Sequence, residues 1–158
     1  TGRGVIKNGG DSWFFLTADY AFGHSLEKDA TEVIKAAGGK VVGSVRHPLA
    51  TTDFSSFLLQ AQASKAKVVA LANAGGDTVN SIKAAHEFGL TPKQMLAGLL
   101  VFINDVHALG LQTAQNMVLT ESFYWDMNDE TRKWSKRFFD KARKMPNMIQ
   151  AGTYSPFR

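Results

Sequence analysis

The sequence predicts an α/β protein with three layers, in which a mostly parallel sheet carries helices on both faces. Three observations predict this fold. Short apolar runs recur along the chain, as in strands that are buried on both faces. Between these runs, apolar residues recur every three or four positions, as along one side of a helix. The two patterns alternate about five times with short connections, which favours parallel strands joined by helical crossovers.

The first strand and helix follow a short glycine-rich start. Residues 1–10 (TGRGVIKNGG) have little periodicity and look like the end of an earlier element or a linker. Residues 13–16 (WFFL) are an apolar run bounded by turn residues, which predicts a strand. An apolar stripe from Leu26 to Ala37 predicts a helix, and Gly38-Gly39 is expected to end it in the left-handed conformation.

Two further strands and two helices occupy the middle of the chain. Residues 40–46 (KVVGSVR) and 67–72 (KVVALA) predict strands. Thr51-Thr52-Asp53 offers a capping residue for a helix between them. A second helix is expected to begin near Asp77 and to end at Gly89.

The last part of the chain predicts two more strands and two more helices. Strands are expected at residues 94–100 and 116–123, with a short helix within residues 102–112 between them. Asn128 is expected to cap the last helix, and Pro146 lies just beyond the end of its apolar stripe.

The net charge of +4 lies in a single segment. Residues 128–144 contain seven basic and three acidic residues, so the other eleven basic and eleven acidic residues sum to zero. Trp134 and Phe138 lie four positions apart in this segment, which is the spacing of a core-facing helix stripe. The basic residues therefore predict a solvated helix face, and no nucleic-acid partner is expected. No apolar run of about 18 residues occurs, so no membrane insertion is expected.

The sequence contains no recognisable catalytic motif. The phosphate-binding patterns GxGxxG and GxxxxGK[ST] and the nucleophile pattern GxSxG do not occur, and there is no cysteine. The histidines have no metal-ligand spacing, and each is expected at the surface or partly buried: His24, His47, His86 and His107. We therefore expect no catalytic residue, no metal, no cofactor and no enzymatic activity. A doubly wound enzyme would lack every motif that it needs.

Four predicted turns follow strands and meet at the carboxyl edge of the sheet, where open α/β sheets bind ligands. They are residues 17–20, 73–77, 102–105 and 123–126. Together they offer aromatic rings, short polar side chains and helix N-termini. Such a set suits a small polar or aromatic solute. Gly75-Gly76 before a helix could hold an anion or could serve only as a tight turn.

Several segments together resemble one family. Residues 13–23 (WFFLTADYAFG) resemble the start of the second lobe in periplasmic solute-binding proteins of ABC transporters, of the branched-chain amino-acid (Leu/Ile/Val) type. Residues 38–58 (GGKVVGSVRHPLATTDFSSFL) are similar to the family's second strand, turn and helix. Residues 67–90 and 121–138 (ESFYWDMNDETRKWSKRF) resemble later strand–helix units. The likeness extends over nearly all of residues 11–154.

The resemblance implies a two-lobed, periplasmic, Rossmann-like transport protein that traps a solute between its lobes and delivers it to an ABC permease. This chain resembles the second lobe only. Residues 1–10 are interpreted as the end of a hinge or first-lobe segment, and residues 11–150 as the α/β ligand-binding lobe. Residues 151–158 are interpreted as the start of a crossover toward a missing first lobe.

The resemblance also implies ligand-facing positions, which are carried over residue by residue. These positions are Tyr20, Asn73, Ala74, Gly75, Phe102, Asp105 and Tyr124, with Trp125 beside the last. Their expected ligand is an amino acid-like or aromatic carboxylate solute.

Two hypotheses for function remain. The first is the solute-binding subunit of an ABC importer, which closes about a hinge over its solute. The alternative is a stand-alone α/β sensor or regulatory domain that binds a metabolite or a protein partner. A piece of a two-lobed protein should expose apolar surface where its missing neighbours pack, whereas a stand-alone domain should bind its solute without a first lobe.

Overall fold

The computed structural model describes residues 1–155 of the chain. The chain divides into two compact units. The first, which we call the sheet unit, comprises Thr1–Val101 and Leu109–Thr120. The second, which we call the helical unit, comprises Phe102–Ala108 and the described residues from Glu121 onward. The predicted bounds 1–10, 11–150 and 151–158 stay a prediction, and residues 156–158 of the predicted crossover lie outside the described residues.

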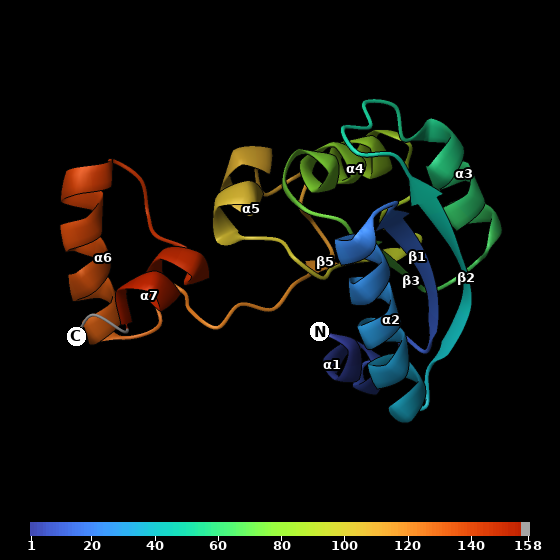
Figure 1. The fold of residues 1–158 in the computed structure, drawn as a ribbon, viewed down its shortest axis with the longest axis horizontal. Coiled ribbons are helices and arrows are strands. Elements are labelled where there is room, and N and C mark those ends of the chain that lie inside the picture. Colours follow the sequence, from blue (N-terminus) through green and yellow to red (C-terminus); the bar gives the residue numbers. More distant parts are fainter. Residues whose placement is uncertain (156–158) are drawn as a thin grey trace. The chain divides into compact units, whose positions relative to one another are not determined.

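The sheet unit contains a five-stranded parallel sheet (Figure 1). Its strands are β1 (Ser12–Ala18), β2 (Lys40–His47), β3 (Val68–Ala72), β4 (Met95–Gly98) and β5 (Met117–Val118). Their order is β2-β1-β3-β4-β5, and each neighbouring pair runs parallel. The predicted α/β fold with a parallel sheet is therefore confirmed.

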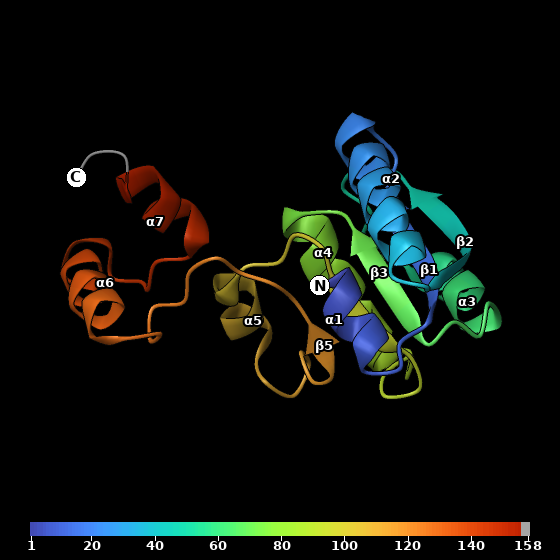
Figure 2. The same ribbon diagram turned by 90° about the horizontal axis from the view of Figure 1, so that it is seen from below.

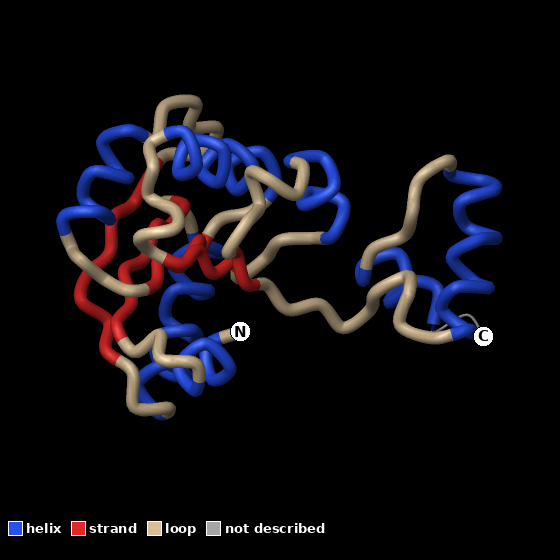
Figure 3. Tube along the Cα trace, turned by 180° about the vertical axis from the view of Figure 1, so that it is seen from behind, coloured by secondary structure: helices blue, strands red, loops and turns tan. Residues whose placement is uncertain are grey.

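Helices cover both faces of this sheet (Figures 2 and 3). One core layer joins α3 (Ser55–Ala63) and α4 (Gly75–Glu87) to one face of the strands. The other layer joins α1 (Gly2–Lys7) and α2 (Ala21–Ala36) to the opposite face. The sheet unit thus has the three predicted layers.

The first strand explains why the sheet is buried on both sides. Successive side chains of a strand point to opposite faces. Trp13 and Phe15 belong to the core layer of α1 and α2, whereas Phe14 and Leu16 belong to the layer of α3 and α4. All four are buried. A continuous apolar run is thus what a central parallel strand needs.

The end strand β2 differs from the central strands. Its residues alternate between exposed and partly buried from Lys40 to Arg46, and only His47 at its end is fully buried. It pairs with β1 alone, because it is the outermost strand on that side.

The helix ends follow their glycines. Gly38 has φ +86° directly after the last turn of α2, and Gly89 has φ +69° after α4. Both values lie in the left-handed region that glycine adopts without a steric penalty. The predicted helix ends at these two positions are confirmed.

Several predicted boundaries differ from the structure. The strand expected at 94–100 is the shorter β4, and the one expected at 116–123 is only Met117–Val118. The reason is the backbone pairing that is available to β5. This strand forms ladder hydrogen bonds with β4 only, over the two pairs Leu96↔Met117 and Ala97↔Val118. Residues 1–10, interpreted as an earlier element or linker, include the helix α1.

The helical unit contains α5 (Ile103–Leu109, whose last residue belongs to the sheet unit), α6 (Asp129–Ala142) and α7 (Met148–Tyr154). The predicted cap of α6 is confirmed: the Asn128 side chain accepts a hydrogen bond from the Thr131 N–H at 3.0 Å. The helix α7 was not predicted. It begins with a second capping box, formed by Asn147 and Gln150. No helix among the described residues is long and apolar enough to cross a membrane.

Candidate functional site

The sheet changes direction between β1 and β3. The chain passes from β1 to its neighbour β2 on one side, and from β3 to β4 on the other. The helices after these two strands, α2 and α4, cover opposite faces of the sheet. Such a switch point opens a crevice at the carboxyl ends of the two strands, where open α/β sheets bind ligands. The turns after β1 and β3 carry Tyr20 and Asn73–Gly75.

The turn after β1 presents an aromatic side chain. Tyr20 is the residue before α2, in extended conformation, and 37% of its surface is exposed. Its ring centroid lies 5.7 Å from that of Phe22. The backbone of this turn is fixed on both sides, since the Tyr20 N–H donates to the Ala18 carbonyl and the Asp19 N–H donates to the His47 carbonyl, each at 2.8 Å.

A glycine that the sequence analysis missed lets α2 begin here. A Cβ atom on Gly23 would lie 2.1 Å from the carbonyl oxygen of Ala18, which no real side chain could tolerate. The first turn of α2 therefore approaches the end of β1 closely, and Tyr20 stands at the edge of the sheet as a result. The available signal was a glycine inside an otherwise helical pattern.

The turn after β3 presents backbone rather than side chains. Ala74 precedes α4 in extended conformation, and Gly75 begins the helix with φ +59°. Gly75 and Gly76 are exposed. The N-terminal turn of a helix carries unpaired N–H groups and a partial positive charge, which favour an anion.

Asn73 faces the interior. It is fully buried, and its Oδ1 accepts a hydrogen bond from the Thr78 hydroxyl at 2.8 Å. Its Nδ2 lies 3.2 Å from Nε2 of His47 and 3.4 Å from Oγ of Ser81. The expectation that every histidine lies at the surface or partly buried is wrong for His47, which has no exposed surface. Sequence reasoning missed it because its partner Asn73 lies 26 positions further along the chain.

Two other predicted positions occur together in the helical unit. The backbone N–H of Phe102 donates to Oδ2 of Asp105 at 3.0 Å, so this carboxylate caps the start of α5. Glu121 also caps the start of α5, because its Oε1 accepts a hydrogen bond from the N–H of Ile103 at 2.8 Å. Burial raises the pKa of the Glu121 carboxyl above its ordinary value. The hydrogen bond from Ile103 opposes this rise, and the negative charge of Asp105 adds to it.

Tyr124, the last predicted position, also belongs to the helical unit. It is 39% exposed, and its ring centroid lies 5.4 Å from that of Trp125. The structure thus joins Tyr20 and Asn73–Gly75 within the sheet unit, and Phe102 and Asp105 within the helical unit.

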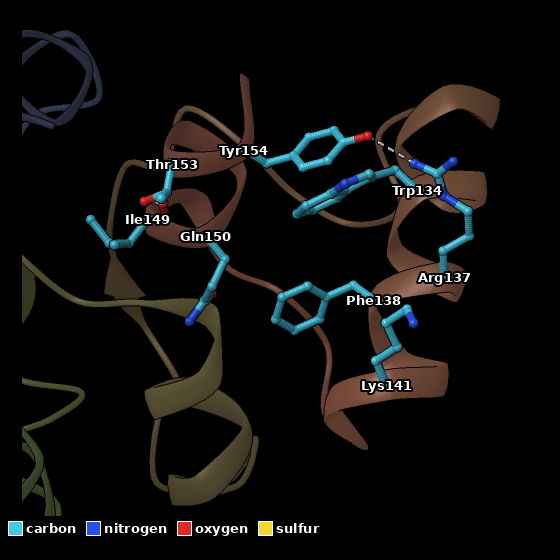
Figure 4. Close-up of a pocket in the computed structure, with 8 residues that line it drawn as sticks. All are labelled: Trp134, Arg137, Phe138, Lys141, Ile149, Gln150, Thr153 and Tyr154. Atoms are coloured by element: carbon cyan, nitrogen blue, oxygen red, sulfur yellow. Dashed lines mark hydrogen bonds between the residues drawn. The ribbon is translucent and has the colours of Figure 1, made fainter. Parts of the chain in front are cut away.

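The helical unit carries an apolar groove between α6 and α7, which we call the α6–α7 groove (Figure 4). Its volume is about 770 Å³. Its lining residues are Trp134, Arg137, Phe138, Lys141, Ile149, Gln150, Thr153 and Tyr154. The rings of Phe138 and Tyr154 lie 5.6 and 5.3 Å from that of Trp134, and Arg137 donates a hydrogen bond to the Tyr154 hydroxyl at 3.0 Å.

Among residues 1–155, no group of three or more histidine, aspartate or glutamate side chains is arranged to hold a metal ion.

The sheet unit thus has a parallel sheet with a switch point, and the turns after β1 and β3 lie at the carboxyl ends of the two strands beside it. The chain belongs to the periplasmic binding protein family, which matches residues 1–157. The resemblance to ABC-transporter binding proteins of the branched-chain amino-acid type is confirmed. Such proteins are not enzymes, and the family implies an extracytoplasmic location.

Three relatives illustrate the match. A periplasmic binding protein from Burkholderia mallei is 63% identical over 99% of this chain and 42% of its own, with a TM-score of 0.93. A branched-chain amino-acid ABC transporter periplasmic ligand-binding protein from Burkholderia xenovorans LB400 is 40% identical over 98% of this chain and 41% of its own, with a TM-score of 0.88. The Leu/Ile/Val-binding protein homolog 6 of Brucella melitensis is 32% identical over 90% of this chain and 36% of its own. The chain thus spans less than half the length of these relatives.

Proposed function

We propose that this chain is part of the periplasmic solute-binding subunit of an ABC importer. The subunit captures an amino acid-like or aromatic carboxylate solute by closing about a hinge, and it passes the solute to a permease. The observation that carries this proposal is the pairing of an exposed aromatic ring, Tyr20, with the exposed N-terminal turn of α4 at one switch point of the sheet.

The two turns suit the two ends of such a solute. The Tyr20 ring offers an apolar face to an aliphatic or aromatic group. The N–H groups at Gly75 and Gly76 offer an anion site to a carboxylate. Phe102, Asp105 and Tyr124 remain further candidates for ligand contact. The names of the relatives from Burkholderia xenovorans and Brucella melitensis support an amino acid.

The proposal includes a first lobe that this chain does not supply, and the α6–α7 groove supports it. Ile149, Trp134 and Phe138 all line the groove, and Ile149 is 53% exposed. Side chains of this kind pack against a neighbouring element in a complete fold. We assign the rest of the two-lobed protein as the occupant of the groove, because the Burkholderia mallei relative has more than half of its chain outside the matched part.

The test uses a chimera in which this chain replaces the matching 42% of the Burkholderia mallei protein. Calorimetry with leucine, isoleucine, valine, phenylalanine and benzoate should find at least one ligand. Tyr20→Ala should weaken its binding at least tenfold, or about 1.4 kcal/mol. Val42→Ala, an exposed position on β2, is the control and should bind as the unaltered chimera does. The proposal fails if none of these solutes binds, and Tyr20 is not a ligand contact if its removal changes nothing.

One observation favours the alternative of a stand-alone sensor domain: the sheet unit buries its own core on both faces of the sheet. A single experiment separates the two readings. If the 158-residue chain alone binds one of these solutes as tightly as the chimera does, the result supports a stand-alone sensor domain and contradicts the two-lobed binding protein.

A further inference from the structure

A buried polar cluster connects the two turns of the proposed site. Its members are fully or almost fully buried in the sheet unit: His47, Asn73, Thr78 and Ser81. Buried polar groups are costly unless they are hydrogen-bonded, so a satisfied cluster of this kind fixes the orientation of each side chain.

The cluster determines where the proton of His47 lies. Nδ1 of His47 is 2.8 Å from the carbonyl oxygen of Pro48, and because a carbonyl only accepts, Nδ1 carries the hydrogen. The hydroxyl of Ser81 donates to the Thr78 carbonyl at 2.9 Å, so its oxygen is left to accept from Nδ2 of Asn73. The Thr78 hydroxyl donates to Oδ1 of Asn73, which orients the amide the same way.

The orientation of the Asn73 amide then determines the state of the second ring nitrogen of His47. Nδ2 of Asn73 is a donor and lies 3.2 Å from Nε2 of His47, so Nε2 accepts and carries no hydrogen. A proton on Nε2 would set two donors against each other. The His47 ring is also packed against apolar neighbours, with the centroids of Phe54 and Phe57 at 4.9 and 6.1 Å.

His47 contacts both turns at once. Its backbone carbonyl accepts the Asp19 N–H at 2.8 Å, next to Tyr20. Its side chain accepts from Asn73, directly before Ala74 and Gly75. A neighbouring bond strengthens this connection, since the Ala50 N–H, just after β2, donates to Oδ2 of Asp77 in the first turn of α4 at 3.2 Å.

We propose that His47 is a positioning residue which, with its single ring proton on Nδ1, fixes the turn that carries Tyr20 relative to the turn that carries Gly75. The inference rests on the proposed function for its consequence in binding. Its structural part, the state of the imidazole and its partner Asn73, can be tested without any solute.

The first test is ¹⁵N NMR of the histidine rings in the 158-residue chain, with the His47 signals assigned by their loss in His47→Gln. We expect protonated Nδ1 and unprotonated Nε2 at neutral pH. Asn73→Asp replaces the donor with an acceptor and should bring a proton onto Nε2. Asn80→Asp is the control and should leave the ring unchanged, because Asn80 is a partly buried residue of the same helix whose Nδ2 donates to the Thr51 carbonyl. A hydrogen on Nε2 in the unaltered chain overturns the proposal. This hydrogen is observed in the unaltered chain itself, and His47→Gln serves only to assign the signals.

The second test measures solute affinity in the chimera. His47→Leu removes the acceptor and should weaken binding at least fivefold. In His47→Gln, Oε1 can accept from Asn73 in place of Nε2, and affinity should return to within about twofold of the unaltered chimera. A loss that Gln does not restore, or no loss with Leu, overturns the positioning role. If the unaltered chimera binds nothing, the proposed function fails while the NMR result still decides the state of His47.

Discussion

The sheet unit and the helical unit differ in how completely they bury their apolar side chains. In the sheet unit, Trp13, Phe15 and Leu71 have no exposed surface, and helices close both faces of the sheet. In the helical unit, Trp134 and Phe138 line an open groove instead. A parallel sheet with crossover helices completes its own core, whereas two short amphipathic helices cannot. This difference supports the proposal that the helical unit packs against the rest of a longer protein.

The largest expected effect is a loss of stability in the core of the sheet unit. Phe15→Ala should cost about 3–5 kcal/mol of the unfolding free energy of the sheet unit, because it leaves a cavity in a fully buried layer. Phe138→Ala, which truncates the same kind of side chain in the groove, should cost about 1 kcal/mol or less. Hydrogen exchange of the β3 amides measures the first effect. Equal losses would mean that the two units do not differ as described.

A second prediction concerns the close approach that places Tyr20. Gly23→Ala should destabilise the sheet unit by about 1–3 kcal/mol, since the new methyl group meets the Ala18 carbonyl. Gly76→Ala is the matched control, because nothing lies within 4 Å of its Cβ position. This control should be neutral or stabilising by up to about 1 kcal/mol. Urea unfolding of both variants checks the pair, and a tolerated Gly23→Ala would contradict the close packing of α2 on β1.

A third prediction concerns the Asn128 cap at the start of α6 in the helical unit. Asn128→Ala removes the acceptor of the Thr131 N–H and should destabilise α6 by about 1 kcal/mol. Asn128→Asp keeps an acceptor and should change little. Hydrogen exchange in the first turn of α6 measures both, and equal behaviour of the two variants would show that the cap does not hold the helix.

The smallest effect concerns Glu121. Its raised pKa means that the folded state holds the proton more tightly than the unfolded state, so ionisation costs stability. This cost is absent below the ordinary pKa of 4.5 and grows as the pH rises through the folded value. Glu121→Gln keeps an acceptor for Ile103 and should raise the unfolding temperature slightly at pH 7. This increase in unfolding temperature should vanish near pH 4. An increase that persists at pH 4 would contradict the raised pKa of Glu121 as its cause.

Local patterns predicted most of the sheet unit. The run VVALA of β3 is apolar throughout and buried throughout, so its bounds differ by one residue from the prediction. The end strand β5 was predicted too long, because its apolar residues do not reveal that β4 offers only two pairing positions. The helix α7 could have been found, since Asn147 and Gln150 have the spacing of a capping box.

The candidate site was predictable only in part. The turns that carry Tyr20 and Ala74-Gly75 follow from the order of strands and helices, and the resemblance to a family pointed to the same residues. The cluster around His47 did not follow, because it joins residues 26 positions apart and depends on side-chain direction. Hydrogen bonds between distant turns leave no periodic signal in a sequence.

The position of β2 at the end of the sheet has a consequence for association between chains. Its outer backbone groups are a template to which another strand could add, and His47 lies at the end of that same strand. The exposed residues Lys40 and Arg46 place positive charge along β2 and oppose such an addition by a second copy. Salt screens that repulsion. Strand addition to the outer edge of β2 is therefore opposed more strongly at low ionic strength than at high ionic strength.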